Sequence, residues 1–166
     1  MQCQEGEIMA KVLNYGMVGG GPDAFIGDAH RRAISLDESA RLVAGVFSRN
    51  AEKSKKMGEV LHIEEERCYK DYETMALEEA KREDGIDFVV VVTPNASHYE
   101  ICKAFLNAGI HVVCDKPVTT TYEKAVELQK LAEEKSLLFM VTYTYMGHVT
   151  AKYARDLIAS GAIGDV

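Results

Sequence analysis

The stretch that decides the fold is KVLNYGMVGGGPDAFIG, Lys11–Gly27. Its first part, Lys11–Val18, has the short apolar pattern of a buried strand. Three consecutive glycines, Gly19–Gly21, follow this strand directly, and Gly27 opens a segment with the pattern of a helix, Gly27–Asp37. A glycine-rich turn between a strand and a helix is typical of a loop that holds the pyrophosphate of a dinucleotide.

The spacing of this loop differs from that of the common dinucleotide motif, G-x-G-x-x-G. Gly19 suits the tight turn, Gly21 suits close approach of the backbone to the pyrophosphate, and Gly27 suits close helix packing. The last gap is five residues instead of two, so the loop must bulge at Pro22–Phe25. The alternative is a plain turn, but its position between a strand and a helix favours a dinucleotide site.

Segments with strand and helix patterns alternate along the rest of the chain. Strands are predicted at Leu42–Phe47, Arg67–Tyr69, Asp87–Val92, Ile110–Cys114 and Leu137–Thr142. Helices are predicted at Ala51–Val60, Tyr72–Arg82, Ala96–Ala108, Tyr122–Lys135 and Val149–Ser160, with Asn95 and Thr120 as caps. Because the strands are apolar on both faces, the sequence predicts an α/β fold, a Rossmann-type doubly wound parallel sheet.

Composition narrows the class of function. The chain has 166 residues, is 47% hydrophobic and carries a formal net charge of −7, as expected for one globular domain that binds no nucleic acid. No apolar stretch approaches the roughly 20 residues of a membrane helix, and Met1–Lys11 lacks a signal-peptide core, so we expect a cytoplasmic protein with no membrane partner. No two of its four cysteines have C-x-x-C spacing, so no metal site is expected.

The end of the second predicted strand bears on the choice of dinucleotide. Dinucleotide folds usually place Asp or Glu about 20 residues after the glycine loop to bind the ribose hydroxyls of NAD. Here the sequence reads Ser48-Arg49, and Lys53 lies one helical turn further. A hydroxyl and two cations suit a 2′-phosphate. The missing acid favours NADP, with NAD as the alternative, although Arg49 could also be a solvated residue at a helix start.

Two further strand ends carry polar residues. Thr93-Pro94-Asn95 closes one strand, and His98 follows on the next helix, where it either reaches a ribose or is partly buried. Asp115-Lys116-Pro117 closes the next strand. Lys116 could hold a substrate hydroxyl and help its proton leave as hydride departs. The alternative is a surface turn before a proline.

These motifs together resemble the glucose–fructose oxidoreductase/inositol dehydrogenase (Gfo/Idh/MocA) family over Val12–Val166. The stretches that carry the resemblance are Gly19–Gly27, Ser48-Arg49, Thr93-Pro94-Asn95-Ala96-Ser97-His98, Cys114-Asp115-Lys116-Pro117 and Gly161–Asp165. In the fourth stretch, Asp115 replaces the glutamate of the family's Glu-Lys-Pro signature.

The resemblance implies hydride transfer between a nicotinamide cofactor and a hydroxyl carbon of a sugar, polyol or related small molecule. It implies that Lys116 is the catalytic lysine, that Asp115 and Pro117 shape its turn, and that Tyr143 and Tyr145 contact substrate or nicotinamide. The cofactor contacts expected in addition to the glycine loop, Ser48, Arg49 and Lys53 are Phe25, Ile26, Thr93, Pro94, Asn95, His98, Asp115, Lys116 and Pro117.

Family members have two domains. We therefore expect an N-terminal extension at residues 1–10, the nucleotide-binding domain at 11–160, and at 161–166 the crossing to a second α/β domain that is absent from this chain. Such a chain should bind the dinucleotide but turn substrate over poorly, and an apolar surface left by the missing domain could favour a homo-oligomer.

Two other functions fit parts of the sequence. A non-catalytic dinucleotide-binding module or sensor would keep the glycine loop and Ser48-Arg49 but make no use of Lys116. A methyltransferase-like domain would also open with a glycine-rich turn, but it predicts an acid at the end of the second strand, where Ser48-Arg49 stands.

Overall fold

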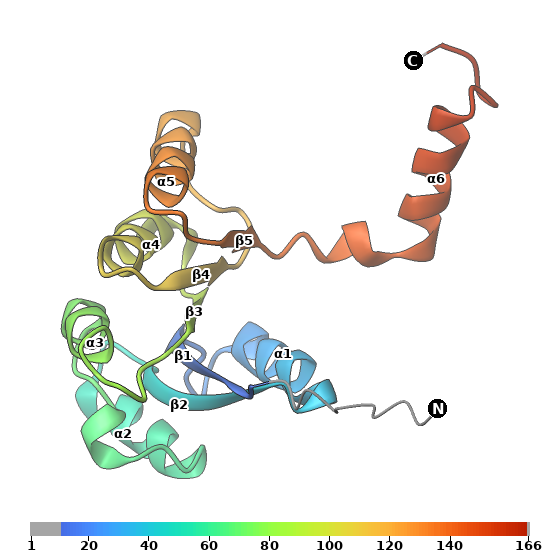
Figure 1. The fold of residues 1–166 in the computed structure, drawn as a ribbon. Helices are drawn as coiled ribbons and strands as arrows, with labels where there is room; N and C mark the ends of the chain where they lie inside the picture. The colour runs from blue at the N-terminus through green and yellow to red at the C-terminus, as the bar shows by residue number, and fades with distance from the viewer. Residues whose placement is uncertain (1–10, 166) are drawn as a thin grey trace, which may run out of the picture.

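The computed structural model describes residues 11–165, and its centre is a five-stranded sheet in the order β2-β1-β3-β4-β5 (Figure 1). The strands are β1 (Leu13–Gly19), β2 (Ala40–Val46), β3 (Phe88–Val92), β4 (His111–Cys114) and β5 (Phe139–Val141). Every neighbouring pair is parallel. The predicted doubly wound parallel sheet is therefore confirmed. The predicted extension at residues 1–10 lies outside the described residues.

Helices cover both faces of the sheet. They are α1 (Phe25–Ile34), α2 (Ala51–Val60), α3 (Tyr72–Glu79), α4 (His98–Asn107), α5 (Tyr122–Glu134) and α6 (Val149–Ala159). Figure 1 shows α3, α4 and α5 on one side of the sheet and α1 on the other, while α6 stands away from it. No residue of α6 is buried. Within the described part of the chain, no helix has the length and apolar character needed to cross a membrane.

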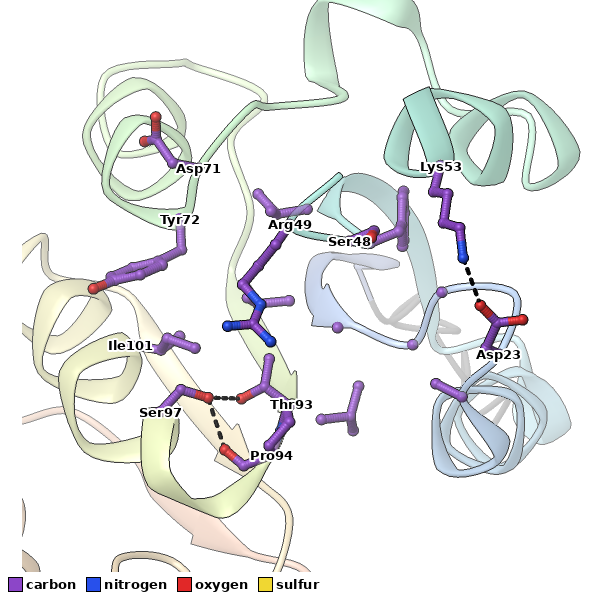
Figure 2. A pocket seen from close by; sticks show the side chains of 18 of the residues that line it. Asp23, Ser48, Arg49, Lys53, Asp71, Tyr72, Thr93, Pro94, Ser97 and Ile101 are labelled. Atoms are coloured by element: carbon purple, nitrogen blue, oxygen red, sulfur yellow. Dashed lines mark hydrogen bonds and ion pairs between the residues drawn. The ribbon is translucent and has the colours of Figure 1, made fainter. Parts of the chain in front are cut away.

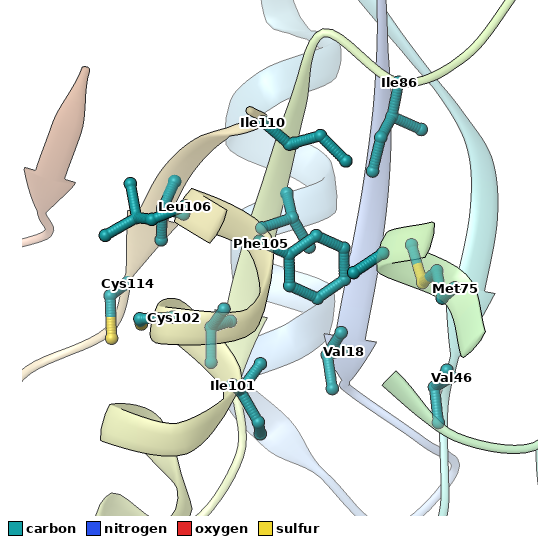
Figure 3. Packing of buried hydrophobic residues seen from close by; sticks show 14 of the residues in the cluster. Val18, Val46, Met75, Ile86, Ile101, Cys102, Phe105, Leu106, Ile110 and Cys114 are labelled. Carbon is teal, nitrogen blue, oxygen red and sulfur yellow. The ribbon is translucent and has the colours of Figure 1, made fainter. Parts of the chain in front are cut away.

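Alternate residues of β3 face two separate apolar clusters. Val89 and Val91 pack with α4 and α5 in the larger cluster, whereas Val90 and Val92 pack in the smaller cluster under α1 and α2. Figure 3 shows the larger cluster around Phe105 of α4. This alternation is the reason that β3 is apolar on both faces, as the sequence predicted.

Several local predictions were wrong. Arg67–Tyr69 is not a strand: a short 3₁₀ helix, η2 (Glu65–Arg67), leads into a single bridge between Gly45 and Cys68. Thr121, not Thr120, caps α5, and its hydroxyl accepts a hydrogen bond from the Lys124 backbone N–H. Asn95 does not cap α4, because it begins a 3₁₀ helix, η3 (Asn95–Ser97), that precedes α4.

A buried ion pair holds the segment between α2 and α3 in place. The side chains of Arg67 and Glu79 are 4% and 0% exposed, and the Arg67 Nε donates to Glu79 Oε1 at 3.0 Å. The Tyr69 hydroxyl donates to the same carboxylate at 2.8 Å. Burial and the hydrogen bond to Glu79 raise the pKa of Tyr69. This cluster ties the segment before α3 to the end of α3.

Candidate functional site

A cavity of about 810 Å³ opens beyond the carboxyl ends of β1, β2 and β3. This is the edge at which doubly wound sheets bind their ligands, and the volume falls within the usual range for small-molecule sites. The walls come from the loop after β1, the end of β2, the start of α3 and the β3–α4 turn (Figure 2). Of the predicted site residues, the cavity brings together Gly19, Gly21, Ser48, Arg49, Lys53, Thr93 and Pro94.

The glycine loop is held so closely that side chains would not fit. Gly19 has φ +95°, and a Cβ there would lie 2.5 Å from the Val92 carbonyl oxygen. A Cβ on Gly21 would lie 2.5 Å from the Phe47 carbonyl oxygen, and one on Gly27 would lie 2.4 Å from the Gly20 Cα. The glycines therefore let the loop pack closely against the end of β3, the end of β2 and the start of α1. Gly19, Gly20 and Gly21 present backbone without side chains to the cavity, as the pyrophosphate-binding loop of a dinucleotide fold does.

Arg31 of α1 holds this loop by a hydrogen bond to its backbone. Its Nη1 donates to the Gly20 carbonyl oxygen at 3.0 Å, and its side chain is only 13% exposed. The sequence analysis did not single out Arg31 as a site residue; an arginine one helical turn after Gly27 was the available signal. Phe25 is 88% exposed and Ile26 packs into the smaller apolar cluster, so neither predicted cofactor contact lines the cavity.

Ser48 lies next to the glycine loop, as the NADP hypothesis requires. A Cβ on Gly21 would lie 4.0 Å from the Ser48 Cβ. The Ser48 Oγ accepts a hydrogen bond from the Asn50 backbone N–H at 3.1 Å, which leaves its own O–H able to donate to a ligand.

The two cations beside Ser48 point in different directions. Arg49 extends across the cavity toward Thr93 and Ser97, whereas Lys53 lies on the side of the glycine loop (Figure 2). The Lys53 Nζ pairs with Asp23 Oδ2 at 3.0 Å. In this structure Lys53, rather than Arg49, is the cation nearer to the loop, and a carboxylate accompanies it.

The β3–α4 turn forms the opposite wall of the cavity. Thr93, Pro94, Ser97 and Ile101 line it, whereas Asn95 does not. The Ser97 hydroxyl donates to the Pro94 carbonyl oxygen at 2.7 Å and lies 2.8 Å from Thr93 Oγ1. The wall is thus fixed by hydrogen bonds within the turn.

His98 lies beneath this wall and not in it. The residue is 0% exposed, and its Nε2 and Nδ1 lie 2.8 Å from the Thr93 and 2.9 Å from the Pro117 carbonyl oxygens. A carbonyl oxygen can only accept, so both hydrogen bonds form together only when both ring nitrogens carry a proton. His98 therefore ties the end of β3 to the turn after β4. In this arrangement it does not reach a ribose.

His98 and Cys114 should affect stability in opposite directions as pH rises. Burial lowers the pKa of His98, but hydrogen bonds to Cys114, Pro117 and Thr93 raise it overall to about 9. A raised pKa in the folded state gives stability that is fully present below the ordinary value of 6.5 and is lost as pH rises through about 9. Hydrogen bonds with Cys102 and His98 lower the pKa of Cys114 to about 6, although burial opposes them, and the stability that this contributes grows as pH rises through the same window. We therefore expect the two slopes largely to cancel in the wild type, and the free energy of unfolding to fall with rising pH only in Cys114→Ser, where the thiol no longer titrates. Urea unfolding of the two proteins between pH 6.5 and 9 checks this, and equal pH slopes would contradict it.

Asp115, Lys116 and Pro117 follow β4 but do not line the cavity. Asp115 Oδ1 accepts from the Thr142 hydroxyl at 3.0 Å and lies 3.9 Å from the His30 Nε2. Burial lowers the pKa of His30, and the nearby Asp115 carboxylate partly opposes this. Lys116 is exposed at the same edge of the sheet. Asp115 thus fixes the turn that presents Lys116.

Tyr145 lies apart from the cavity. It belongs to a 3₁₀ helix beyond β5, η4 (Thr144–Gly147), and is 77% exposed. Its ring contacts that of His148, with the ring centroids 5.7 Å apart. The structure therefore does not bring Tyr145 together with the glycine loop.

The sequence analysis missed one wall of the cavity. Lys70, Asp71, Tyr72 and Glu73, at the start of α3, line it, and so does Asp23 of the glycine loop. Asp71 caps α3 by accepting from the Thr74 backbone N–H at 2.7 Å. A capping Asp at the start of a helix was the available signal, but this helix follows a loop and not a strand end, which is where doubly wound folds usually bind ligands.

Comparison with known proteins places this site in context. The Gfo/Idh/MocA family model, described as an oxidoreductase family with an NAD-binding Rossmann fold, matches residues 13–143. An uncharacterized oxidoreductase of Bacillus subtilis, YfiI, is 45% identical over 160 residues, which cover 96% of this chain and 41% of that protein. This chain therefore spans about 41% of the length of that relative.

Two further relatives are named for their dinucleotides. The NADP(+)-dependent scyllo-inositol 2-dehydrogenase IolW of Bacillus subtilis is 36% identical over 90 residues, which cover 54% of this chain and 25% of that protein. The crystal structure of an inositol dehydrogenase homolog complexed with NAD+ from Azotobacter vinelandii is 42% identical, with a TM-score of 0.89. The match covers 94% of this chain and 40% of that one. The first relative is named for NADP(+), whereas the second is a complex with NAD+.

Proposed function

Because this chain belongs to the Gfo/Idh/MocA family of oxidoreductases, we propose that it binds a nicotinamide dinucleotide and supplies the cofactor half of a hydride-transfer site. The observation that carries this proposal is the glycine loop, because Gly19, Gly20 and Gly21 line the cavity between the end of β1 and the start of α1. The loop amides would hold the pyrophosphate at the start of α1. When bound, the nicotinamide would accept or give the hydride.

We propose NADP(H) as the preferred dinucleotide. Three features support it: the Ser48 hydroxyl that is able to donate, the cations Arg49 and Lys53 in the cavity lining, and the absence of a carboxylate where β2 ends. Phosphate oxygens form strong charge-assisted hydrogen bonds with such groups. Asp23 opposes this preference, because its carboxylate pairs with Lys53, one of these two cations.

We propose a sugar, polyol or related hydroxyl compound as the substrate of the whole protein. Lys116 would donate a hydrogen bond to the reacting oxygen and stabilise charge on it as hydride moves. Asp115, held by the Thr142 hydroxyl, would position this lysine. His98 would hold the same turn against Thr93, next to the cofactor.

Titration of the purified chain with NADPH and NADH, followed by nicotinamide fluorescence, tests the proposal. We expect both to bind and NADPH to bind more tightly. Ser48→Ala should weaken NADPH binding by about threefold, and NADH binding less, because the hydroxyl loses a charge-assisted hydrogen bond at a half-exposed site. Ser160→Ala, at the exposed end of α6, is the matched control.

Two results would contradict this proposal. Failure of both dinucleotides to bind would remove the cofactor site. A rise in melting temperature with S-adenosylmethionine but not with either dinucleotide would instead indicate a methyltransferase-like domain.

A further inference from the structure

The extended glycine loop places a carboxylate at the cavity. The Ala24 backbone N–H donates to the Gly21 carbonyl oxygen at 3.0 Å, which closes a β-turn with Pro22 and Asp23 at its corners. Proline and aspartate are favoured residues of such turns. The turn is built from the residues that lengthen the usual motif, so the extension itself brings Asp23 to the cavity lining.

Lys53 reaches the same place from the other side. The Asn50 side chain caps α2 by accepting from the Lys53 backbone N–H at 3.0 Å, which fixes Lys53 in the first helical turn. Its Nζ then meets Asp23 Oδ2 at 3.0 Å (Figure 2). The ion pair joins the loop after β1 to the helix after β2, beside Ser48.

We propose that Asp23 weakens the preference for NADP over NAD by pairing with Lys53, which leaves this cation less available to a 2′-phosphate. The inference rests on the proposed dinucleotide binding. In many dinucleotide folds an acid at the end of the second strand disfavours the phosphate. Here that position reads Ser48-Arg49, and the acid comes from the glycine loop. Because Asp23 acts on a cation, it limits the preference for NADP without abolishing it.

Asp23→Asn provides the main test. The side chains of Asp23 and Lys53 are 82% and 58% exposed, so solvent weakens their interaction and the expected effect is moderate. We expect the ratio of NADPH to NADH affinity to rise by about twofold to fivefold in Asp23→Asn, and the rise to shrink in high salt. Glu78→Gln, which removes the partner of Lys81 from an ion pair of similar length, is the matched control. An unchanged ratio in Asp23→Asn would overturn the inference.

A double-mutant cycle tests the route through Lys53. In a Lys53→Met background, Asp23→Asn should change the affinity ratio by less than half as much as in the wild type. An equal change in both backgrounds would overturn the claim that Asp23 acts by holding Lys53. If the wild type binds neither dinucleotide, the proposed function fails and the inference falls with it. If it binds both but the ratio does not move in Asp23→Asn, only the inference fails.

Discussion

Replacing Glu79 with alanine is expected to lower the free energy of unfolding by about 3–5 kcal/mol. The change leaves the guanidinium of Arg67 buried without its main partner, and the Tyr69 hydroxyl loses its acceptor. The remaining partner, Asp84, is largely exposed, and its Oδ2 lies 3.3 Å from the Arg67 Nη1. Such a loss is a large part of the roughly 5–15 kcal/mol that stabilises a typical domain. Urea unfolding followed by circular dichroism measures it.

Two comparisons separate the buried charge from other effects. Glu78→Ala, one residue earlier in α3, removes an exposed carboxylate and should change stability by less than about 0.5 kcal/mol. Arg67→Met combined with Glu79→Leu removes both charges and should be more stable than Glu79→Ala alone. A loss in Glu79→Ala no larger than in Glu78→Ala would contradict the importance of this ion pair.

Gly27→Ala should weaken dinucleotide binding at least tenfold, the equivalent of about 1.4 kcal/mol. The new Cβ would lie 2.4 Å from the Gly20 Cα, and a backbone atom cannot move aside as a flexible side chain can. Helix α1 and the glycine loop would have to move apart, and the loop N–H groups would no longer be positioned to bind the pyrophosphate. Fluorescence titration with NADPH and NADH measures the loss.

The control for this change is Gly147→Ala. A Cβ there would meet nothing within 4 Å, so both dinucleotides should bind as to the wild type. A circular-dichroism spectrum of Gly27→Ala that matches the wild type would show that the sheet persists. Wild-type affinity in Gly27→Ala would mean that the pyrophosphate lies elsewhere.

The sequence predicted the sheet well because its strands are apolar on both faces. The predicted helix at Ala51–Val60 has the bounds of α2, and Asp87–Val92 differs from β3 by one residue. The first residue of a helix was predicted less accurately where several residues that can cap a helix stand in a row. Thr119, Thr120 and Thr121 are all able to cap a helix, and only the path of the folded chain selects Thr121.

The cavity was predictable only where its residues follow strands. Ser48 and Thr93 were found because parallel strand ends share one edge of the sheet. Asp23 and Tyr72 were missed because a loop turn and a helix start bring them there. For His98 the sequence left two alternatives, contact with a ribose or burial. The structure shows the buried alternative, in which the ring bonds two carbonyl oxygens.

The pairing of β1 with β3 has a consequence for biosynthesis. Tyr15 pairs with Phe88 and Gly19 with Val92, while β2, the other neighbour of β1, ends at Val46. On a ribosome, β1 can therefore meet β2 long before β3 emerges. Contacts between distant segments also slow spontaneous refolding. The Val92 carbonyl oxygen lies against Gly19 in the folded protein, but Val92 is synthesised long after Gly19. The glycine turn therefore reaches its final conformation only after β3 has left the ribosome.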